Sequence, residues 1–323
     1  MGYYALNRVL HGVLLAFAVS VFTFALLELA PGSYFDELKA NPNISQDAIT
    51  LLKTRYGLDQ PLLIRYGRWL KSTSHGDFGL SLAYNAPVAP LLLRRAKNTM
   101  MLTGLATMLA WAIAIPLGLW TLTNKSSWRG HAVEMATSGL LVVPDMILAL
   151  ACLWIAVRTH AFPVGGMTSL GFDELSVWAK AKDLALHLML PVLALVLSTL
   201  PVLVRHLRSS MAEVLSSPFI SAARAHGIPR RSLLFRYALP AAANPLISLF
   251  GLSLAGLLSG SMLVEVIMGW PGIGPLLLEA ILARDVYVVI GSVMLSALLV
   301  IFANLVADLL LYAADPRIRS VSV

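Results

Sequence analysis

Long apolar runs, separated by short polar stretches, dominate the pattern of residues along this chain. An α-helix needs about 20 apolar residues to cross the hydrocarbon layer of a bilayer, which is about 30 Å thick. Six runs reach that length: Val9–Leu29, Thr99–Leu122, Ala132–Val157, Leu184–Val204, Leu246–Met268 and Val286–Tyr312. They are too long for barrel strands, so the pattern predicts an all-α, polytopic membrane protein with six transmembrane helices.

Composition supports this class and narrows the expected partners. Hydrophobic residues make up 58% of the 323 and charged residues 13%, whereas a soluble domain carries about 25% charged residues. The formal net charge is +7. In a membrane protein such an excess usually marks the cytoplasmic loops, so we expect a lipid bilayer and no nucleic acid as partner. The single cysteine, Cys152, lies in an apolar run and excludes an intrachain disulfide.

The basic residues of the short loops predict how the chain is oriented. Short cytoplasmic loops carry an excess of Lys and Arg. The residues that set the orientation are Lys125, Arg129, the stretch from Arg205 to Arg236, Arg317 and Arg319. Both termini are therefore expected to be cytoplasmic. The chain would divide into a tail with the first span (1–30), an external loop or cap region (31–97) and a five-helix core (98–323) with a cytoplasmic loop at 206–245.

Two short helices are expected in the external region, because turn-forming residues mark their limits. The first is Ser45–Tyr56, with Ser45 as N-cap and Gly57 as its stop, and the second is Leu62–Ser72, following Pro61. Within the spans, several prolines predict kinks, and three glycines of the fifth span predict close helix packing before any pathway role. These residues are Pro116, Pro144, Pro191, Pro201, Gly251, Gly256 and Gly260.

The most polar segment of the second half, Phe219–Pro240, predicts two short helices outside the bilayer. Gly227 supplies a helix C-terminal turn, and Pro229 suits the first turn of the next helix. Its arginines are Arg224, Arg230, Arg231 and Arg236. An ordinary cytoplasmic linker, made basic for topology alone, would have the same composition.

Asp145 is the ionisable residue of the spans that merits a functional hypothesis. It follows Pro144 in the middle of the third run, and intramembrane ionisable groups are often functional. It could meet a substrate ammonium or a metal in a pathway, or pair with a neighbouring helix. A proton-driven transporter would normally need a relay of such groups. The chain also lacks a Gly-rich phosphate-binding loop and any Ser/His/Asp or His/Cys grouping, so we expect no catalytic residue, no metal site and no ATP hydrolysis by this chain.

Several motifs resemble those of one family. Ser221-Ala222-Ala223, followed by Gly227 and then by Leu239-Pro240, resembles the EAA loop of ABC-importer permeases. Further stretches resemble the first permease of the dipeptide/oligopeptide/nickel branch: 29–33, 56–70, 75–81, 208–240, 264–289 and 304–319. The resemblance covers nearly the whole chain, and its motifs occur in the family's order.

The resemblance implies a type I ABC-importer permease fold in a bacterial inner membrane. It implies a heterodimer with a second, similar permease, two cytoplasmic ATP-binding subunits and an external solute-binding protein. This chain would bind no cofactor, since ATP and Mg²⁺ would sit on the ATPases. The expected cargo is short peptides. The alternatives are nickel or another small solute carried by the same machinery, and a stand-alone secondary transporter.

The resemblance also assigns site residues. The expected ATPase-coupling residues are Ser221, Ala222, Ala223, Arg224, Gly227, Arg230 and Arg231. Small residues would let a short helix sink into a groove, and the arginines would meet acidic groups around it. The expected external gate or docking turn consists of Trp270, Pro271, Gly272 and Gly274. Ser221 replaces the family's usual Glu and is expected to cap the short helix. Asp145 stands where the family commonly has an apolar or small residue.

Overall fold

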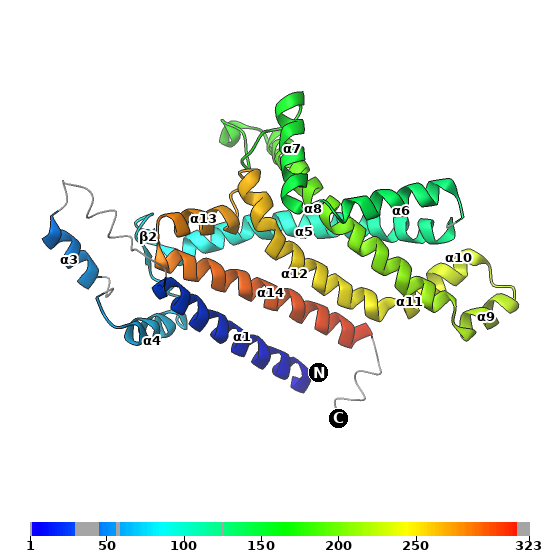
Figure 1. Cartoon of the computed structure of the whole chain (residues 1–323), viewed down its shortest axis with the longest axis horizontal. Coiled ribbons are helices and arrows are strands. Elements are labelled where there is room, and N and C mark those ends of the chain that lie inside the picture. Colours follow the sequence, from blue (N-terminus) through cyan, green and yellow to red (C-terminus); the bar gives the residue numbers. More distant parts are fainter. Residues whose placement is uncertain (1, 30–44, 56–58, 125, 315–323) are drawn as a thin grey trace. The chain divides into compact units, whose positions relative to one another are not determined.

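The structure is a computed structural model, and it describes residues 2–29, 45–55, 59–124 and 126–314. Gly57, Lys125, Arg317, Arg319 and most of the 29–33 motif lie outside these ranges. The elements, as labelled in Figure 1, are α1 (Gly2–Leu29), α3 (Gln46–Arg55), α4 (Leu62–Thr73), β1 (Leu80–Ser81), β2 (Ala86–Pro87), α5 (Val88–Thr123), α6 (Trp128–Leu140), α7 (Asp145–Thr159), the 3₁₀ turn η1 (Phe172–Glu174), α8 (Val177–Leu215), α9 (Pro218–Ala225), α10 (Arg230–Ser232), the π-helical η2 (Leu233–Ala238), α11 (Leu239–Ala241), α12 (Ala243–Ile267), α13 (Ile273–Leu282) and α14 (Val286–Ala314).

The all-α prediction is confirmed. Five helices are long and apolar enough to cross a membrane, namely α1, α5, α8, α12 and α14, and the bent pair α6 and α7 makes a sixth span if the two are counted together. The β structure of the described residues is one short antiparallel pair, in which Leu80 faces Pro87. The expected external helices are present as α3, which begins directly after Ser45, and α4, which follows Pro61.

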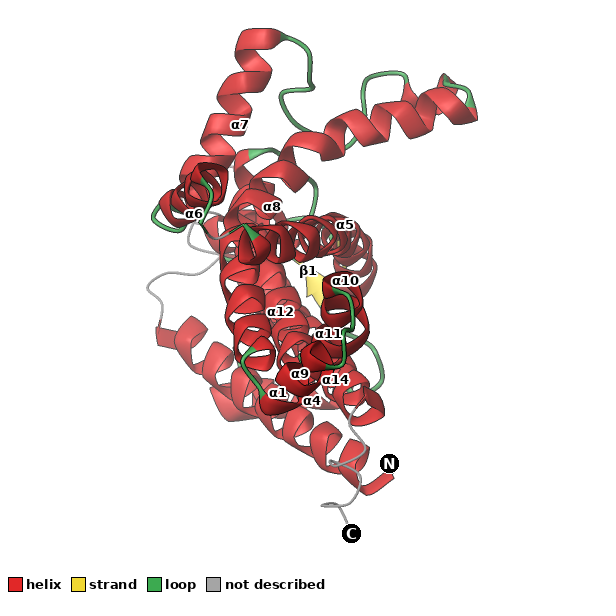
Figure 2. Cartoon of the chain, turned by 90° about the vertical axis from the view of Figure 1, so that its right-hand side faces the viewer, coloured by secondary structure: helices red, strands yellow, loops and turns green. Residues whose placement is uncertain are grey.

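The third span differs from its prediction. A single kinked helix was expected, but α6 and α7 are separate helices that meet at 103°, and both views show α7 turning away from α6 (Figures 1 and 2). Pro144 has an extended backbone (ψ 144°) and occupies the N-cap position of α7. Proline disfavours helical geometry at the residue before it and donates no hydrogen bond, so the chain leaves the helix at 141–144. Pro116, Pro191 and Pro201, by contrast, lie inside helices that continue past them.

The chain divides into two compact units, which we describe separately. The first unit comprises the described parts of Met1–Val9, Met100–Trp270 and Leu299–Val323. In it, α7, α8 and α12 pack against one another around a core that includes the fully buried Leu195 and Leu203. An ideal Cβ on Gly251 would overlap the Cβ of Ala307, so α12 and α14 approach closely here and the packing role predicted for this glycine is confirmed.

The second unit comprises the described parts of Leu10–Thr99 and Pro271–Leu298. Asp285 is fully buried in it and holds the β1–β2 hairpin in place. The Asp285 Oδ2 atom accepts hydrogen bonds from Ser81 Oγ at 2.6 Å and from Ala83 N at 3.0 Å. Beside it, the Tyr84 hydroxyl donates to Glu279. Burial, together with this hydrogen bond, raises the pKa of Tyr84 to about 12, so the phenol keeps its donor proton even in alkaline solution that would ionise an ordinary tyrosine.

Replacing Asp285 by alanine should therefore destabilise the protein. The substitution removes the acceptor of three hydrogen bonds and leaves the proton of the buried Ser81 hydroxyl without its acceptor. Each unsatisfied group costs on the order of 1–3 kcal/mol. We expect a clearly lower midpoint of thermal unfolding in detergent, followed by intrinsic fluorescence. Asp47→Ala, which removes an exposed carboxylate of α3, is the matched control and should leave the midpoint unchanged. Equal midpoints for the two variants would contradict this account of the hairpin.

Candidate functional site

Helix α9 forms inside the Arg-rich segment because both of its ends carry the appropriate residues. Ser217 is the N-cap residue, and Pro218 occupies the first turn, where its missing N–H is not needed. At the other end, Gly227 adopts a left-handed conformation (φ +79°). Gly227 N donates to Arg224 O at 3.0 Å, and Ile228 N donates to Ala223 O at 3.3 Å. This pair of bonds is a Schellman turn, which requires the positive φ that glycine adopts without strain.

One of the expected roles in this helix is wrong. Ser221 was expected to cap the short helix, but α9 begins at Pro218, so Ser221 lies in its interior. Its hydroxyl donates to the Ser217 carbonyl at 3.3 Å. The prediction failed because it overlooked Pro218, which starts the helix one turn earlier.

A single fully buried side chain anchors α9 to the rest of the first unit. Ile220 is inaccessible to solvent and packs in a cluster that includes Leu207, Met211 and Leu234. Much of the remaining helix surface is open, since Ser221, Ala222 and Arg224 are exposed, as is about half of Phe219. The helix thus presents small residues and a cation outwards. Figure 1 shows α9 and α10 beyond the end of α8.

The arginines of this segment do not all behave alike. Arg230 Nη2 donates to the carbonyl oxygen of Thr123 at 3.3 Å, in the last turn of α5, where a cation interacts favourably with the helix dipole. Arg224 and Arg231 are exposed, and the structure shows no partner for either guanidinium among the described residues. Two of the three expected docking cations are therefore available at the surface, and the third binds within the chain.

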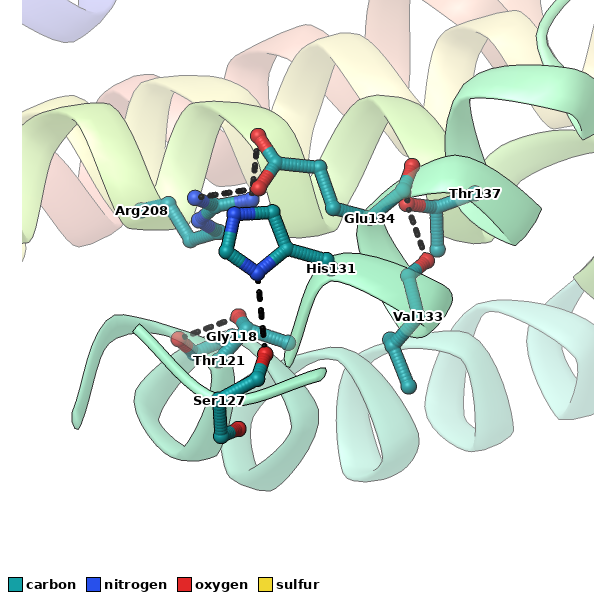
Figure 3. Close-up of polar contacts among 8 residues, drawn as sticks. All are labelled: Gly118, Thr121, Ser127, His131, Val133, Glu134, Thr137 and Arg208. Carbon is teal, nitrogen blue, oxygen red and sulfur yellow. Dashed lines mark hydrogen bonds and ion pairs between the residues drawn. The ribbon is translucent and has the colours of Figure 1, made fainter. Parts of the chain in front are cut away.

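Arg208 connects α8 to α6 (Figure 3). Its Nη1 atom lies 3.1 Å from Glu134 Oε1, and its Nη2 atom donates to Glu134 Oε2 at 3.3 Å. Two parallel bonds of this kind fix the relative orientation of the two side chains. Beside the pair, His131 Nδ1 lies 2.9 Å from Ser127 O, in the first turn of α6. Sequence analysis missed this contact, because Glu134 and Arg208 are 74 residues apart.

A cavity of about 230 Å³ lies between α7, α8 and α12 in the first unit. Its lining is mostly apolar, with Asp145, Ser198, Thr199 and Ser253 as the polar side chains. Asp145 is the first residue of α7, so the break in the third span brings its carboxylate to this cavity. Gly256 also lines the cavity. An ideal Cβ on Gly260 would lie 3.4 Å from Asp145 Oδ2, so the absence of a side chain there leaves room for the carboxylate.

Most residues of the expected gate or docking turn, residues 270–274, are buried, and Pro271 is half-buried. In the first unit, Trp270 is fully buried and its N–H donates to Glu265 O at 2.8 Å. In the second unit, Gly272 and Gly274 are also buried, and Pro271 O accepts a hydrogen bond from Asn98 Nδ2 at 2.8 Å. The gating and docking roles both stay predictions.

The family assignment rests on a match that covers most of the chain. Residues 114–320 match the family model described as "Binding-protein-dependent transport system inner membrane component". The chain belongs to this family. It is a permease subunit of the ABC-importer class, which confirms the resemblance inferred from the motifs. Members of this family work with ATPase subunits and binding proteins. Among the described residues no three His, Cys, Asp or Glu side chains come together.

Individual relatives align over almost their whole length. The oligopeptide transport system permease protein AppB of Bacillus subtilis is 32% identical, with 99% of this chain and 100% of the relative covered. The dipeptide transport system permease protein DppB of Escherichia coli K12 is also 32% identical, with 93% and 94% covered. An inward-facing structure of the MetNI methionine ABC transporter matches with a TM-score of 0.54 at 16% identity, covering 70% of this chain and 96% of that one. This last match shows the fold.

The Arg208–Glu134 contact can be tested by exchanging the two charges. Arg208→Glu or Glu134→Arg alone places like charges together and should lower the free energy of unfolding by about 1 kcal/mol, the upper range for a partly exposed pair. The double exchange should recover at least part of that loss, measured by thermal unfolding in detergent. Glu213→Arg, an exposed change on the same helix, is the control. If the double variant loses as much stability as the two single variants combined, the pair does not hold α6 to α8.

Proposed function

We propose that this permease carries short peptides across a bacterial inner membrane and that α9 is the helix on which a partner ATPase acts. In this proposal the chain pairs with a second, similar permease and has no ATPase site of its own. Two cytoplasmic subunits bind ATP and Mg²⁺, and an external solute-binding protein delivers the cargo. The observation that carries the proposal is an exposed short helix, outside the spans, that is anchored by one side chain.

The surface of α9 suits insertion into a groove of another protein. Ser221 and Ala222 are exposed and small, so a partner's backbone could approach the helix closely, as small residues permit at helix contacts in general. Arg224 and Arg231 stand at the surface as cations and would meet acidic groups around such a groove. Ile220 keeps the helix attached to its own chain from the opposite side.

Helix α8 offers a continuous connection from α9 to the cavity. It ends at Leu215, three residues before α9 begins, and its residues Leu195 to Leu203 reach the cavity lining. At 1.5 Å per residue, the distance from Leu203 to Leu215 is about 18 Å along the helix axis. The Arg208–Glu134 pair transfers a displacement of α8 to α6 as well. ATP-driven movement of α9 would therefore reach the cavity without any further linking element.

The proposed cargo rests on the relatives. Those that match over nearly the whole chain are named for oligopeptides and dipeptides. These names favour peptides over nickel, and membership of the family counts against a stand-alone secondary transporter.

Gly227→Arg should separate the permease from its ATPase while leaving it folded and inserted. An arginine side chain in the turn after α9 would keep the ATPase from approaching closely. A non-glycine residue at positive φ also adds roughly 1–2 kcal/mol of local strain. We expect a loss of ATP-driven peptide uptake into proteoliposomes and a loss of the ATPase from the purified complex.

Two control variants separate the effect of a side chain at position 227 from the effect of backbone strain. Gly76→Arg has the same kind of backbone (φ +83°) and open space around it, but lies in the turn after α4, so the ATPase should still co-purify. Gly227→Asn tolerates a positive φ and is smaller, so uptake should largely persist. Normal uptake and ATPase association in Gly227→Arg would refute the docking role of α9.

A further inference from the structure

The cavity beside Asp145 has the chemistry of a binding site for a cation that donates hydrogen bonds. We propose that it receives a primary ammonium group, such as the amino terminus of a transported peptide. This inference rests on the proposed function, since it names the part of the cargo that the pathway recognises. The site consists of the Asp145 carboxylate, the hydroxyls of Ser198 and Ser253, and the space beside Gly256 of α12.

The two serine hydroxyls of the lining, those of Ser198 and Ser253, offer lone pairs rather than protons. Ser198 Oγ donates to Leu195 O at 3.0 Å, and Ser253 Oγ donates to Phe250 O at 2.8 Å. A hydroxyl has one proton and two lone pairs, so each proton is already used within its own helix. Ser253 Oγ also accepts a bond from Trp111 Nε1 at 3.0 Å, which leaves it one lone pair. These serines therefore present acceptors to a ligand.

The carboxylate of Asp145 makes the site negative. No described residue forms an ion pair or a hydrogen bond with the Asp145 side chain, although it is half-buried. Burying a charge without a partner is costly. The N-terminus of α7 compensates in part, but it carries only about half a positive charge. A net negative charge remains, and an ammonium group with its three donors matches it. The Asp145 carboxylate would repel a carboxylate or phosphate ligand, and neither serine has a proton left to donate to it.

The size of the cavity limits what can enter with the ammonium. A water molecule occupies about 30 Å³ in the liquid, so about 230 Å³ holds an amino group with a short side chain, not a whole long peptide. Gly256 lines this space, and a Cβ at that position would meet nothing within 4 Å. A large side chain at 256 would therefore fill the cavity without a clash at its base.

Equilibrium binding to the purified complex, without the external binding protein, tests this inference. The probes are radiolabelled alanyl-alanine and its analogue lactoyl-alanine, which has a hydroxyl in place of the ammonium. Wild type should prefer alanyl-alanine by roughly 10–100-fold, the value expected for a charge-assisted hydrogen bond. Asp145→Asn should reduce that preference to near unity, because it keeps the size of the side chain and removes its charge. Gly256→Leu should abolish binding of both probes.

The outcomes distinguish a ligand site from a structural carboxylate. Asp173→Asn, the same change at an exposed acid of η1, is the matched control and should preserve the preference. If Asp145→Asn lowers thermal stability but keeps the preference for alanyl-alanine, Asp145 only supports α7 and the inference is wrong. Equal binding of both probes by wild type, or binding of neither, also overturns it. Because binding is read without ATP, a complex that binds alanyl-alanine through Asp145 but shows no ATP-driven uptake would refute the proposed function and not this site.

Discussion

Backbone hydrogen bonding is the constraint on which this structure depends. Within a bilayer, each peptide group must find its partner in the protein, and a helix satisfies almost all of them internally. Ending a helix within the bilayer is therefore costly, because it leaves backbone N–H and C=O groups without partners inside that helix. The break between α6 and α7 is such a place. It ends one helix and begins another in the third apolar run, and the first residue of the new helix is an aspartate that reaches a cavity.

The helices could be predicted from the sequence because their signals are local. Apolar runs of sufficient length predicted the spans, and Pro61, Ser45 and Gly227 marked helix limits correctly. Pro144 shows where local reasoning stops. The same residue type lies inside α8 at 191 and 201 without ending it, so a proline alone does not distinguish a kink from a 103° turn. The difference depends on whether neighbouring helices replace the lost hydrogen bonds, and the sequence does not state which helices are neighbours.

The candidate sites were also predictable only as far as their signals are local in the sequence. Asp145 could be singled out, because an acid in an apolar run is conspicuous, but Ser198 and Ser253 could not. Small hydroxyls are common in membrane helices. The sequence alone shows neither what each hydroxyl faces nor whether its proton already donates a hydrogen bond. The Arg208–Glu134 contact was equally hidden, because it joins positions 74 residues apart. Long-range contacts of this kind require the packing of α6 on α8 to be known first.

The attachment of α9 through Ile220 determines how that helix can move. The helix packs against η2 and the end of α8, and Ile220 is its one fully buried side chain, so most of its surface has no tight packing that would fix its tilt. Its displacement along the direction of α8 is restricted, since α8 follows within three residues. One buried side chain and a short link to α8 restrain the position of α9 more than its orientation. If α9 is the docking helix proposed above, a partner could displace it without keeping a fixed angle to the rest of the chain.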